Sequence, residues 1–125
     1  MPIKMIFCLT RSAGMSREEF QRYWLEEHAP KVRRIGPQSG MIRYAQSHSY
    51  ESRMGDGAAR ARGTAPGYDG VMEGWWESEE AARDAFRSMD PAGGGELLAD
   101  ERRFIDLGRS RLFMTREHLI YGESV

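Results

Sequence analysis

The chain has 125 residues, a length that supports one domain built around one hydrophobic core. Its 18 Lys and Arg residues nearly balance its 19 Asp and Glu residues, and the formal net charge of −1 predicts no nucleic-acid partner. Cys8 is the single cysteine of the sequence, which excludes an intrachain disulfide and a cysteine-based metal site. Because neither a signal peptide nor an apolar run of membrane-spanning length is recognisable, we expect a cytoplasmic protein without membrane contact.

The N-terminal part of the sequence predicts a strand followed by a helix. Residues 3–10 are apolar at nearly every position, which is typical of a central strand with little solvent on either face. The sequence SREE at positions 16–19 fits a capping box that begins a helix, and Phe20, Tyr23 and Trp24 continue it with helical spacing.

The middle of the sequence predicts two strands joined by a long connection. Residues 40–50 alternate imperfectly and form the second strand. Residues 51–66 have no usable periodicity, so we expect a lid or a disordered loop there, with the highest mobility inside the chain. Residues 68–77 form the third strand, with Asp69, Val71, Glu73 and Trp75 on one face and Gly70, Met72, Gly74 and Trp76 on the other.

The C-terminal part predicts a helix in two segments and a last strand. Residues 78–89 begin with a serine cap, and a proline and three glycines within residues 90–95 interrupt the helix. Residues 96–107 resume it, with Gly108 in the place of a C-terminal glycine cap. Residues 111–116 form the fourth strand, and residues 118–121 extend it or form an arm.

The order of these elements, β-α-β-β-α-β, predicts a single α+β domain over residues 1–125. It is the order of the ferredoxin-like fold, in which a four-stranded antiparallel sheet carries both helical segments on one face. Strands this apolar cannot leave the other face in water, so we expect a second copy of the chain to cover it in a homodimer.

Several short stretches also carry a resemblance to a known family. They are KMIFCLTR at 4–11, SREEF at 16–20, YW at 23–24, HAP at 28–30, YDGV at 68–71, FIDL at 104–107 and SR at 110–111. These stretches resemble the EthD family of the dimeric α/β-barrel superfamily, and the resemblance spans nearly the whole chain except residues 51–66. The sequence departs from the family pattern at GWW in 74–76 and at the three glycines in 93–95, and both departures bear on the shape of a pocket.

The resemblance implies a ferredoxin-like homodimer that closes into an α/β barrel, but it leaves the reaction open. Relatives include cofactor-free monooxygenases, polyketide cyclases, lactone isomerases, decarboxylases and haem enzymes, and fold alone does not settle function. Our first hypothesis is a cofactor-independent enzyme acting on a small aromatic or polyketide-like hydrophobic metabolite by cyclisation, isomerisation, dehydration or oxygenation. The second is a non-catalytic small-molecule-binding or accessory dimer, and a haem-binding variant is a distant third.

His28 is the candidate proton-transfer residue. Imidazole takes and gives protons near neutral pH, and position 28 lies one helical turn after Trp24, on the face that carries Tyr23. Pro30 lacks an amide hydrogen, so we expect a kink or break of the helix just after His28 and a last turn that ends at Ile35. The alternative is a structural histidine that binds a carbonyl freed by Pro30.

The third strand offers further candidates. Asp69 and Glu73 share a face with Trp75, and carboxylates beside an indole can bind a small aromatic substrate or orient His28. Because burying Glu73 between apolar neighbours is costly without a partner, we assign it a catalytic role and expect its face to be the helix-facing one. A register shift of one residue would place Trp76 there instead. The alternative for Asp69 is an ion pair with an arginine.

The remaining candidates are for substrate binding. Tyr23, Trp24, Tyr44 and Trp75 provide aromatic surface that suits stacking with a flat molecule. Asp106 lies near a helix end, where an acid is unfavourable, so it either contacts substrate or locks the structure through a specific partner. No metal-ligand spacing, phosphate loop or nucleophile elbow is recognisable, so we expect neither metal nor cofactor.

Overall fold

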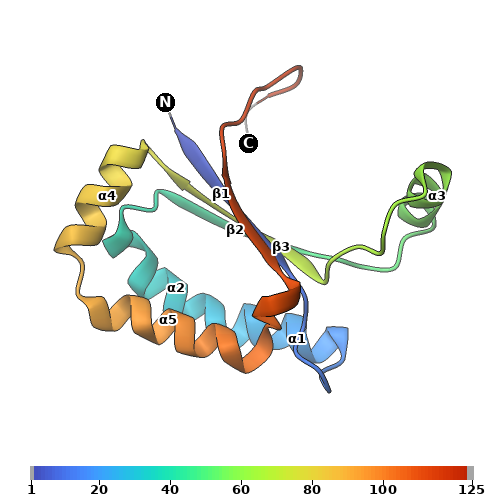
Figure 1. Ribbon diagram of the computed structural model, residues 1–125, viewed down its shortest axis with the longest axis horizontal. Coiled ribbons are helices and arrows are strands. Elements are labelled where there is room, and N and C mark those ends of the chain that lie inside the picture. Colours follow the sequence, from blue (N-terminus) through green and yellow to red (C-terminus); the bar gives the residue numbers. More distant parts are fainter. Residues whose placement is uncertain (1, 124–125) are drawn as a thin grey trace.

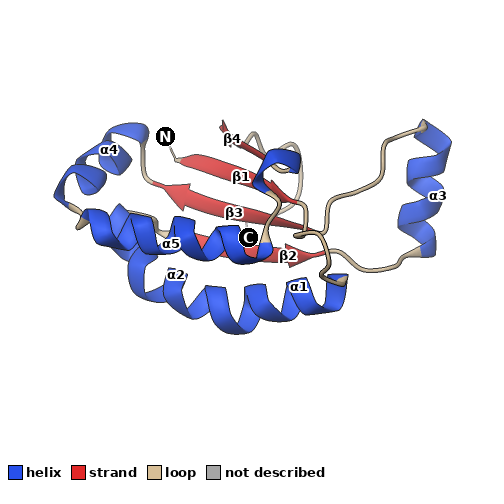
Figure 2. Cartoon of the chain, turned by 60° about the horizontal axis from the view of Figure 1, so that its bottom comes forward, coloured by secondary structure: helices blue, strands red, loops and turns tan. Residues whose placement is uncertain are grey.

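Four antiparallel strands form one sheet in the order β2-β3-β1-β4. They are β1 (Ile3–Leu9), β2 (Arg43–His48), β3 (Gly70–Trp76) and β4 (Arg111–Thr115). This computed structural model describes residues 2–123, and the helices that flank these strands lie against one face of the sheet (Figures 1 and 2). The predicted ferredoxin-like α+β fold is confirmed, with β1 between β3 and β4 as its apolar sequence indicated. Within the described range, no helix is both long enough and apolar enough to cross a membrane.

The first helical layer consists of α1 (Arg17–Tyr23), a π-helical turn η1 (Trp24–His28), α2 (Ala29–Ile35) and a short 3-10 turn η2 (Gly36–Ser39). The predicted capping box is present. The backbone N–H of Glu19 donates to Ser16 Oγ at 3.0 Å, and the Ser16 N–H donates to the Glu19 carboxylate at 3.1 Å.

A break after His28 is not observed, because the chain stays helical as far as Ile35, where the predicted last turn ends, and the turn at residues 24–28 is widened by one residue. In the π turn the N–H of Ala29 donates to the carbonyl of Trp24, five residues earlier. The wider turn changes the hydrogen-bond register immediately before Pro30, whose ring has no N–H to donate. A local π turn therefore replaces the break, and His28 is its last residue.

The core lies between the sheet and the helices. Its main cluster of buried side chains combines residues from the N-terminal and C-terminal parts of the sequence: Phe7, Leu9, Phe20, Trp24, Phe104 and Ile105. A smaller cluster of Ile3, Trp76 and Ala82 fills the other end of the sheet.

The predicted orientation of β3 is wrong, and its glycine face is the one that faces the helices. A Cβ on Gly70 would lie 2.4 Å from Cζ3 of Trp24, so only glycine leaves room for that indole. Trp76 is 2% exposed and donates its indole N–H to the carbonyl of Ser39 at 2.9 Å. Glu73 therefore lies on the opposite, open face, since strand residues alternate between faces.

The connection between β2 and β3 contains a helix that sequence analysis missed. Within residues 51–66, α3 (Arg53–Arg62) begins after a Ser52 cap whose Oγ accepts from the N–H of Gly55 at 3.0 Å. None of its residues is buried, and Figures 1 and 2 show it projecting away from the sheet. The mobility of this segment stays a prediction.

The second helical layer consists of α4 (Glu79–Ser88) and α5 (Pro91–Phe104). The predicted interruption over residues 90–95 is too long, because Asp90 caps α5 and its carboxylate accepts from the N–H of Ala92 at 3.0 Å. Gly93 is helical, and a Cβ there would lie 3.0 Å from Ile35 of α2, so the glycine allows close helix packing. Gly108 caps no helix, since α5 ends at Phe104 and Gly108 lies in the 3-10 turn η3 (Leu107–Arg109).

Candidate functional site

An apolar cavity of about 250 Å³ lies between the helix-facing side of the sheet and the helices. Its walls come from β1, β2, β3 and β4 on one side and from η1, α2, α4 and α5 on the other. Most lining residues are aliphatic, aromatic or methionine side chains. The titratable side chains among those named for its wall are His28, Tyr44 and Glu101.

His28 is held in the cavity wall by Asp100 of α5. The side chain of His28 is only 6% exposed, and its Nδ1 lies 2.7 Å from Oδ2 of Asp100. Its ring also packs on Phe104, with 5.1 Å between the centroids. The π turn positions the backbone of His28, and Asp100 and Phe104 of α5 contact its ring, so the imidazole is held in one orientation.

Asp100 is a buried carboxylate with several donors. Its Oδ1 accepts from the hydroxyl of Tyr23 at 2.6 Å and from Nζ of Lys31 at 2.6 Å, while Oδ2 faces His28. Burial disfavours its charged form, but the hydrogen bonds from Lys31, Tyr23 and His28 outweigh burial and lower the pKa of Asp100 to about 2. Asp100 is therefore ionised at neutral pH.

These contacts define the protonation state of His28. Burial lowers the pKa of His28, and the nearby carboxylate of Asp100 compensates only in part. The neutral ring donates its Nδ1 hydrogen to Asp100, because an ionised carboxylate only accepts. Among the described residues Nε2 has no hydrogen-bond partner, yet it is not sealed from solvent, so its lone pair is available, and His28 is one of the residues that line the cavity.

Two further polar side chains line the same cavity. Burial and the charge of Asp100 raise the pKa of Glu101 to about 7. Tyr44 of β2 accepts a hydrogen bond from Nε2 of Gln46 at 3.0 Å, and burial raises its pKa, with a smaller contribution from Glu101. Glu101 and Tyr44 therefore interact electrostatically within the cavity.

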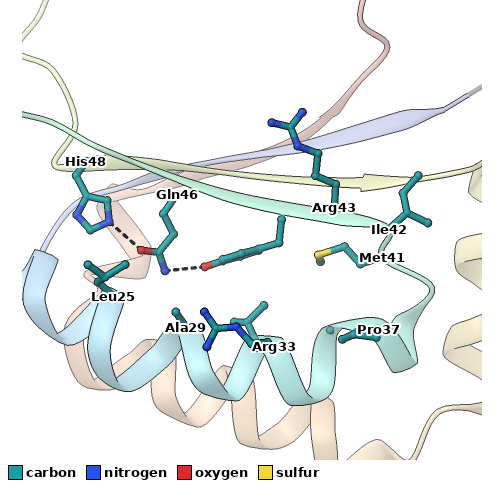
Figure 3. A pocket seen from close by; sticks show the side chains of 12 residues that line it. Leu25, Ala29, Arg33, Pro37, Met41, Ile42, Arg43, Gln46 and His48 are labelled. Atoms are coloured by element: carbon teal, nitrogen blue, oxygen red, sulfur yellow. Dashed lines mark hydrogen bonds between the residues drawn. The ribbon is translucent and has the colours of Figure 1, made fainter. Parts of the chain in front are cut away.

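Tyr44 also forms part of a second, more open groove of about 500 Å³ along β2 (Figure 3). Hydrogen bonds join His48 to Gln46 and Gln46 to Tyr44 along the strand. Figure 3 shows Ala29 and Arg33 of α2 on the opposite wall. The groove and the cavity share wall residues, Tyr44 among them, so this side chain lies at the boundary between the two spaces.

Three of the predicted binding residues gather around His28. Trp24 and Tyr44 line the cavity with it, and Trp24 is 1% exposed beneath His48, with 4.6 Å between ring centroids. Tyr23 lies behind His28, where it binds Asp100 rather than lining the cavity.

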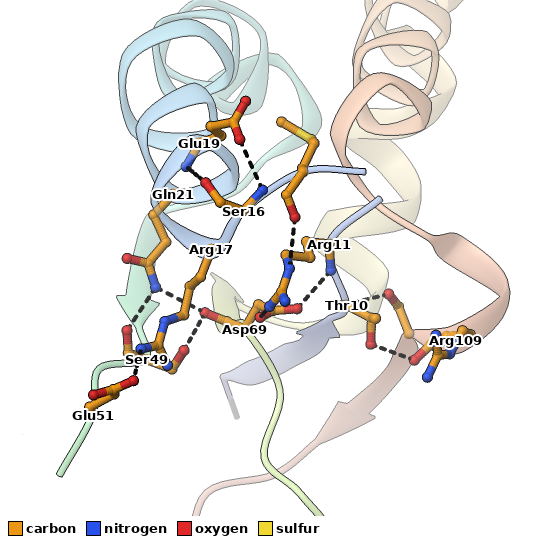
Figure 4. A network of polar contacts seen from close by, with 12 residues as sticks. Thr10, Arg11, Ser16, Arg17, Glu19, Gln21, Ser49, Glu51, Asp69 and Arg109 are labelled. Atoms are coloured by element: carbon orange, nitrogen blue, oxygen red, sulfur yellow. Dashed lines mark hydrogen bonds and ion pairs between the residues drawn. The ribbon is translucent and has the colours of Figure 1, made fainter. Parts of the chain in front are cut away.

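The predicted residues of the third strand do not join them. Glu73 pairs with Lys4 at 2.9 Å on the open sheet face, and the guanidinium of Arg43 lies 4.3 Å from the ring centroid of Trp75 there. Asp69 lies just before β3, where it accepts from the backbone N–H of Arg11 at 2.8 Å and from its guanidinium at 2.6 Å (Figure 4). The structure thus gives Asp69 the arginine partner that was its alternative assignment.

Asp106 is likewise part of a structural junction. Its backbone N–H donates to the carbonyl of Thr10 at 2.8 Å, and its carbonyl accepts from Oγ of Ser110 at 2.7 Å. It is not among the residues that line the cavity.

Sequence reasoning missed Asp100 and Glu101. Both belong to the stripe of α5 that carries Leu97 and Phe104, three or four residues away in each direction. An acidic pair inside an apolar stripe is the signal that could have found them, because such carboxyl groups need a partner or a raised pKa.

Comparison with known protein families identifies the family of this chain. Residues 12–108 match the family model described as the EthD domain. The chain belongs to the EthD family. The resemblance recognised from the sequence is thereby confirmed, and no curated protein sequence gives a significant match.

Solved structures agree on the fold. An EthD family protein from Bacillus halodurans C-125 has a TM-score of 0.63 at 18% identity, covering 94% of this chain and 100% of that one. SnoaB of Streptomyces nogalater, described as a cofactor-independent oxygenase, has a TM-score of 0.58 at 14% identity, covering 98% of each chain. A dimeric ferredoxin-like protein of unknown function from Thermobifida fusca has a TM-score of 0.58 at 14% identity, covering 92% of this chain and 90% of that one.

Proposed function

We propose that this EthD family protein is a cofactor-independent enzyme that acts on a small aromatic or polyketide-like hydrophobic metabolite, with His28 as its proton-transfer residue. The observation that carries the proposal is the neutral imidazole of His28 in the wall of an apolar cavity, fixed by Asp100 through Nδ1 and with no hydrogen-bond partner on Nε2 among the described residues. A base needs a free lone pair and a fixed orientation, and the lowered pKa of His28 keeps the ring in the neutral form that can accept a proton.

Asp100 acts in this proposal as a positioning residue. It keeps the proton of His28 on Nδ1, and it stabilises the imidazolium that forms when Nε2 takes a proton. Tyr23 and Lys31 hold the carboxylate in turn, so that its orientation does not depend on the substrate. Family membership and the likeness to a described cofactor-independent oxygenase support a reaction that needs no bound cofactor.

A homodimer is part of the same proposal. The sheet face away from the helices carries Ile6, Cys8, Val71 and Phe113, and Phe113 is 47% exposed. The Lys4–Glu73 ion pair shares this face with the apolar side chains, and an apolar patch beside charged groups favours a second copy of the chain as its cover. The fold neighbour described as dimeric supports this arrangement.

The test is conversion of a metabolite without added cofactor. The wild-type protein, His28→Gln and Asp100→Asn are incubated with a small-molecule extract of the source organism, and mass spectrometry follows loss of one hydrophobic compound and appearance of its product. His118→Gln, in the exposed segment after β4, is the matched control. We expect conversion by the wild type and the control, and its loss in His28→Gln. A compound that binds to the wild type unchanged would instead favour the non-catalytic binding alternative.

A further inference from the structure

Glu101 is a carboxyl group in an apolar cavity wall that no structural contact explains. Its neighbour Asp100 binds Lys31 and His28, whereas no cation or side-chain donor of the described residues pairs with Glu101. Glu101 is half-buried, and removing a carboxylate from water without a partner is unfavourable, so such a group either neutralises or serves a ligand. At position 101 the chain thus keeps an acid where apolar neighbours such as Leu97 and Ile105 favour an apolar residue.

The position of Glu101 relates it to the other polar groups of the cavity. It follows Asp100 in α5, so it lies beside the residue that holds His28. Tyr44 of β2 shares the same cavity, and the charge of Glu101 contributes to the raised pKa of that phenol. The cavity therefore presents a base, a carboxyl group and a phenol to one small space, surrounded by apolar side chains.

We propose that Glu101 is a second proton-transfer residue of this cavity, and that the substrate is a flat, uncharged molecule with an enolisable carbonyl. The inference rests on the proposed function of His28. Nε2 of His28 takes a proton from the carbon next to the carbonyl, and the electrons of that C–H bond form a C=C bond. The π electrons of the carbonyl move to its oxygen, which takes the proton of the Glu101 carboxyl group. The enol, the imidazolium of His28 and the carboxylate of Glu101 result, and proton exchange with water resets both side chains.

The environment suits this division of roles. Imidazolium is stabilised by Asp100, and the neutral form of Glu101 is stabilised by its burial. A carboxyl group with a pKa of about 7 is present in both forms at neutral pH, which is the condition for efficient acid catalysis there. His28 and Tyr44 line the same cavity as Glu101, and Asp100 adjoins Glu101 in α5 and acts on it by its charge. Tyr44 can hydrogen-bond the carbonyl or enol oxygen.

The experiment uses β-tetralone as a flat ketone probe and follows deuterium exchange of its α-hydrogens by proton NMR in deuterated buffer. We expect wild-type protein to accelerate exchange, with a pH inflection near 7, and Glu101→Gln to slow it at least tenfold and remove that inflection. Glu96→Gln is the matched control on the same helix, since Glu96 pairs with Arg34 and lies outside the cavity. The control is expected to exchange within about twofold of the wild-type rate.

The outcomes separate the two proposals. Exchange that is lost in His28→Gln but unchanged in rate and pH profile in Glu101→Gln overturns the role of Glu101 and leaves that of His28. Exchange unchanged in both variants overturns both roles, and wild-type exchange no faster than in buffer overturns the ketone as ligand class. A carbon-13 titration of the Glu101 carboxyl group in the wild type needs no variant to fold. A midpoint near pH 7 is expected, and one below about pH 5 overturns the proposal.

Discussion

Asp100→Asn removes the charge at the centre of the candidate site while keeping the size of the side chain. Three donors converge on this carboxylate, the Tyr23 hydroxyl, His28 Nδ1 and Lys31 Nζ, all within 2.7 Å. An asparagine offers one acceptor oxygen and turns an amide N–H₂ group toward the remaining donors, so at least one buried donor loses its partner.

The magnitude follows from the pKa of Asp100. A value of about 2 against 3.8 for a free aspartate corresponds to about 2 kcal/mol of stabilisation at pH 7, and the unpaired donor brings the total loss to about 2–4 kcal/mol. For a chain of this size roughly 4 °C of melting temperature corresponds to each kcal/mol, so we expect a drop of about 8–15 °C. Because the pKa is lowered in the folded state, the charge contribution is complete above about pH 5. It falls to about half by pH 3, because the aspartate of the unfolded chain, with a pKa of 3.8, is then largely protonated while that of the folded protein is still ionised.

Thermal unfolding followed by circular dichroism at pH 7 and pH 3 measures both effects. Asp84→Asn is the control, because its carboxylate is 74% exposed and pairs only with Arg87, and we expect it to cost less than about 0.5 kcal/mol. NMR titration of His28 should show a further lowered pKa in Asp100→Asn, because the carboxylate opposes the effect of burial. A loss no larger than that of the control, or one that is the same at both pH values, would refute the reasoning.

Three further predictions concern the fold and the assembly. Gly70→Ala is expected to lower the free energy of unfolding by about 3 kcal/mol, because its Cβ would lie 2.4 Å from Trp24. Gly57→Ala in α3 is the control, because a Cβ added at Gly57 would meet no side chain or other element within 4 Å. Equal urea midpoints for Gly70→Ala and Gly57→Ala would contradict the predicted clash. Replacing residues 53–62 by a Gly-Ser linker should leave the melting temperature within about 3 °C, because α3 has no buried residue, and a larger drop would disprove its independence. Phe113→Asp should convert the proposed homodimer into a monomer in sedimentation velocity, whereas a folded wild-type monomer at micromolar concentration would disprove the dimer.

The sequence by itself determined the order of the elements and, with it, the fold class. The apolar run of residues 3–10 and the capping box at 16–19 are local signals, and local signals survive into the tertiary structure when neighbouring elements agree with them. The position of His28 on the inner side of its helix also followed from helical spacing, since residues one turn apart share a face.

The tertiary structure decided which face of β3 borders the cavity and which residue holds His28. Both faces of β3 carry a tryptophan, so alternation alone does not distinguish them. The choice depends on the space that the indole of Trp24 needs above Gly70. The hydrogen bond between His28 and Asp100 joins residues 72 positions apart, and no local pattern encodes such a separation in sequence. Packing of α5 against the π turn brings the two side chains together, and burial then sets their protonation states.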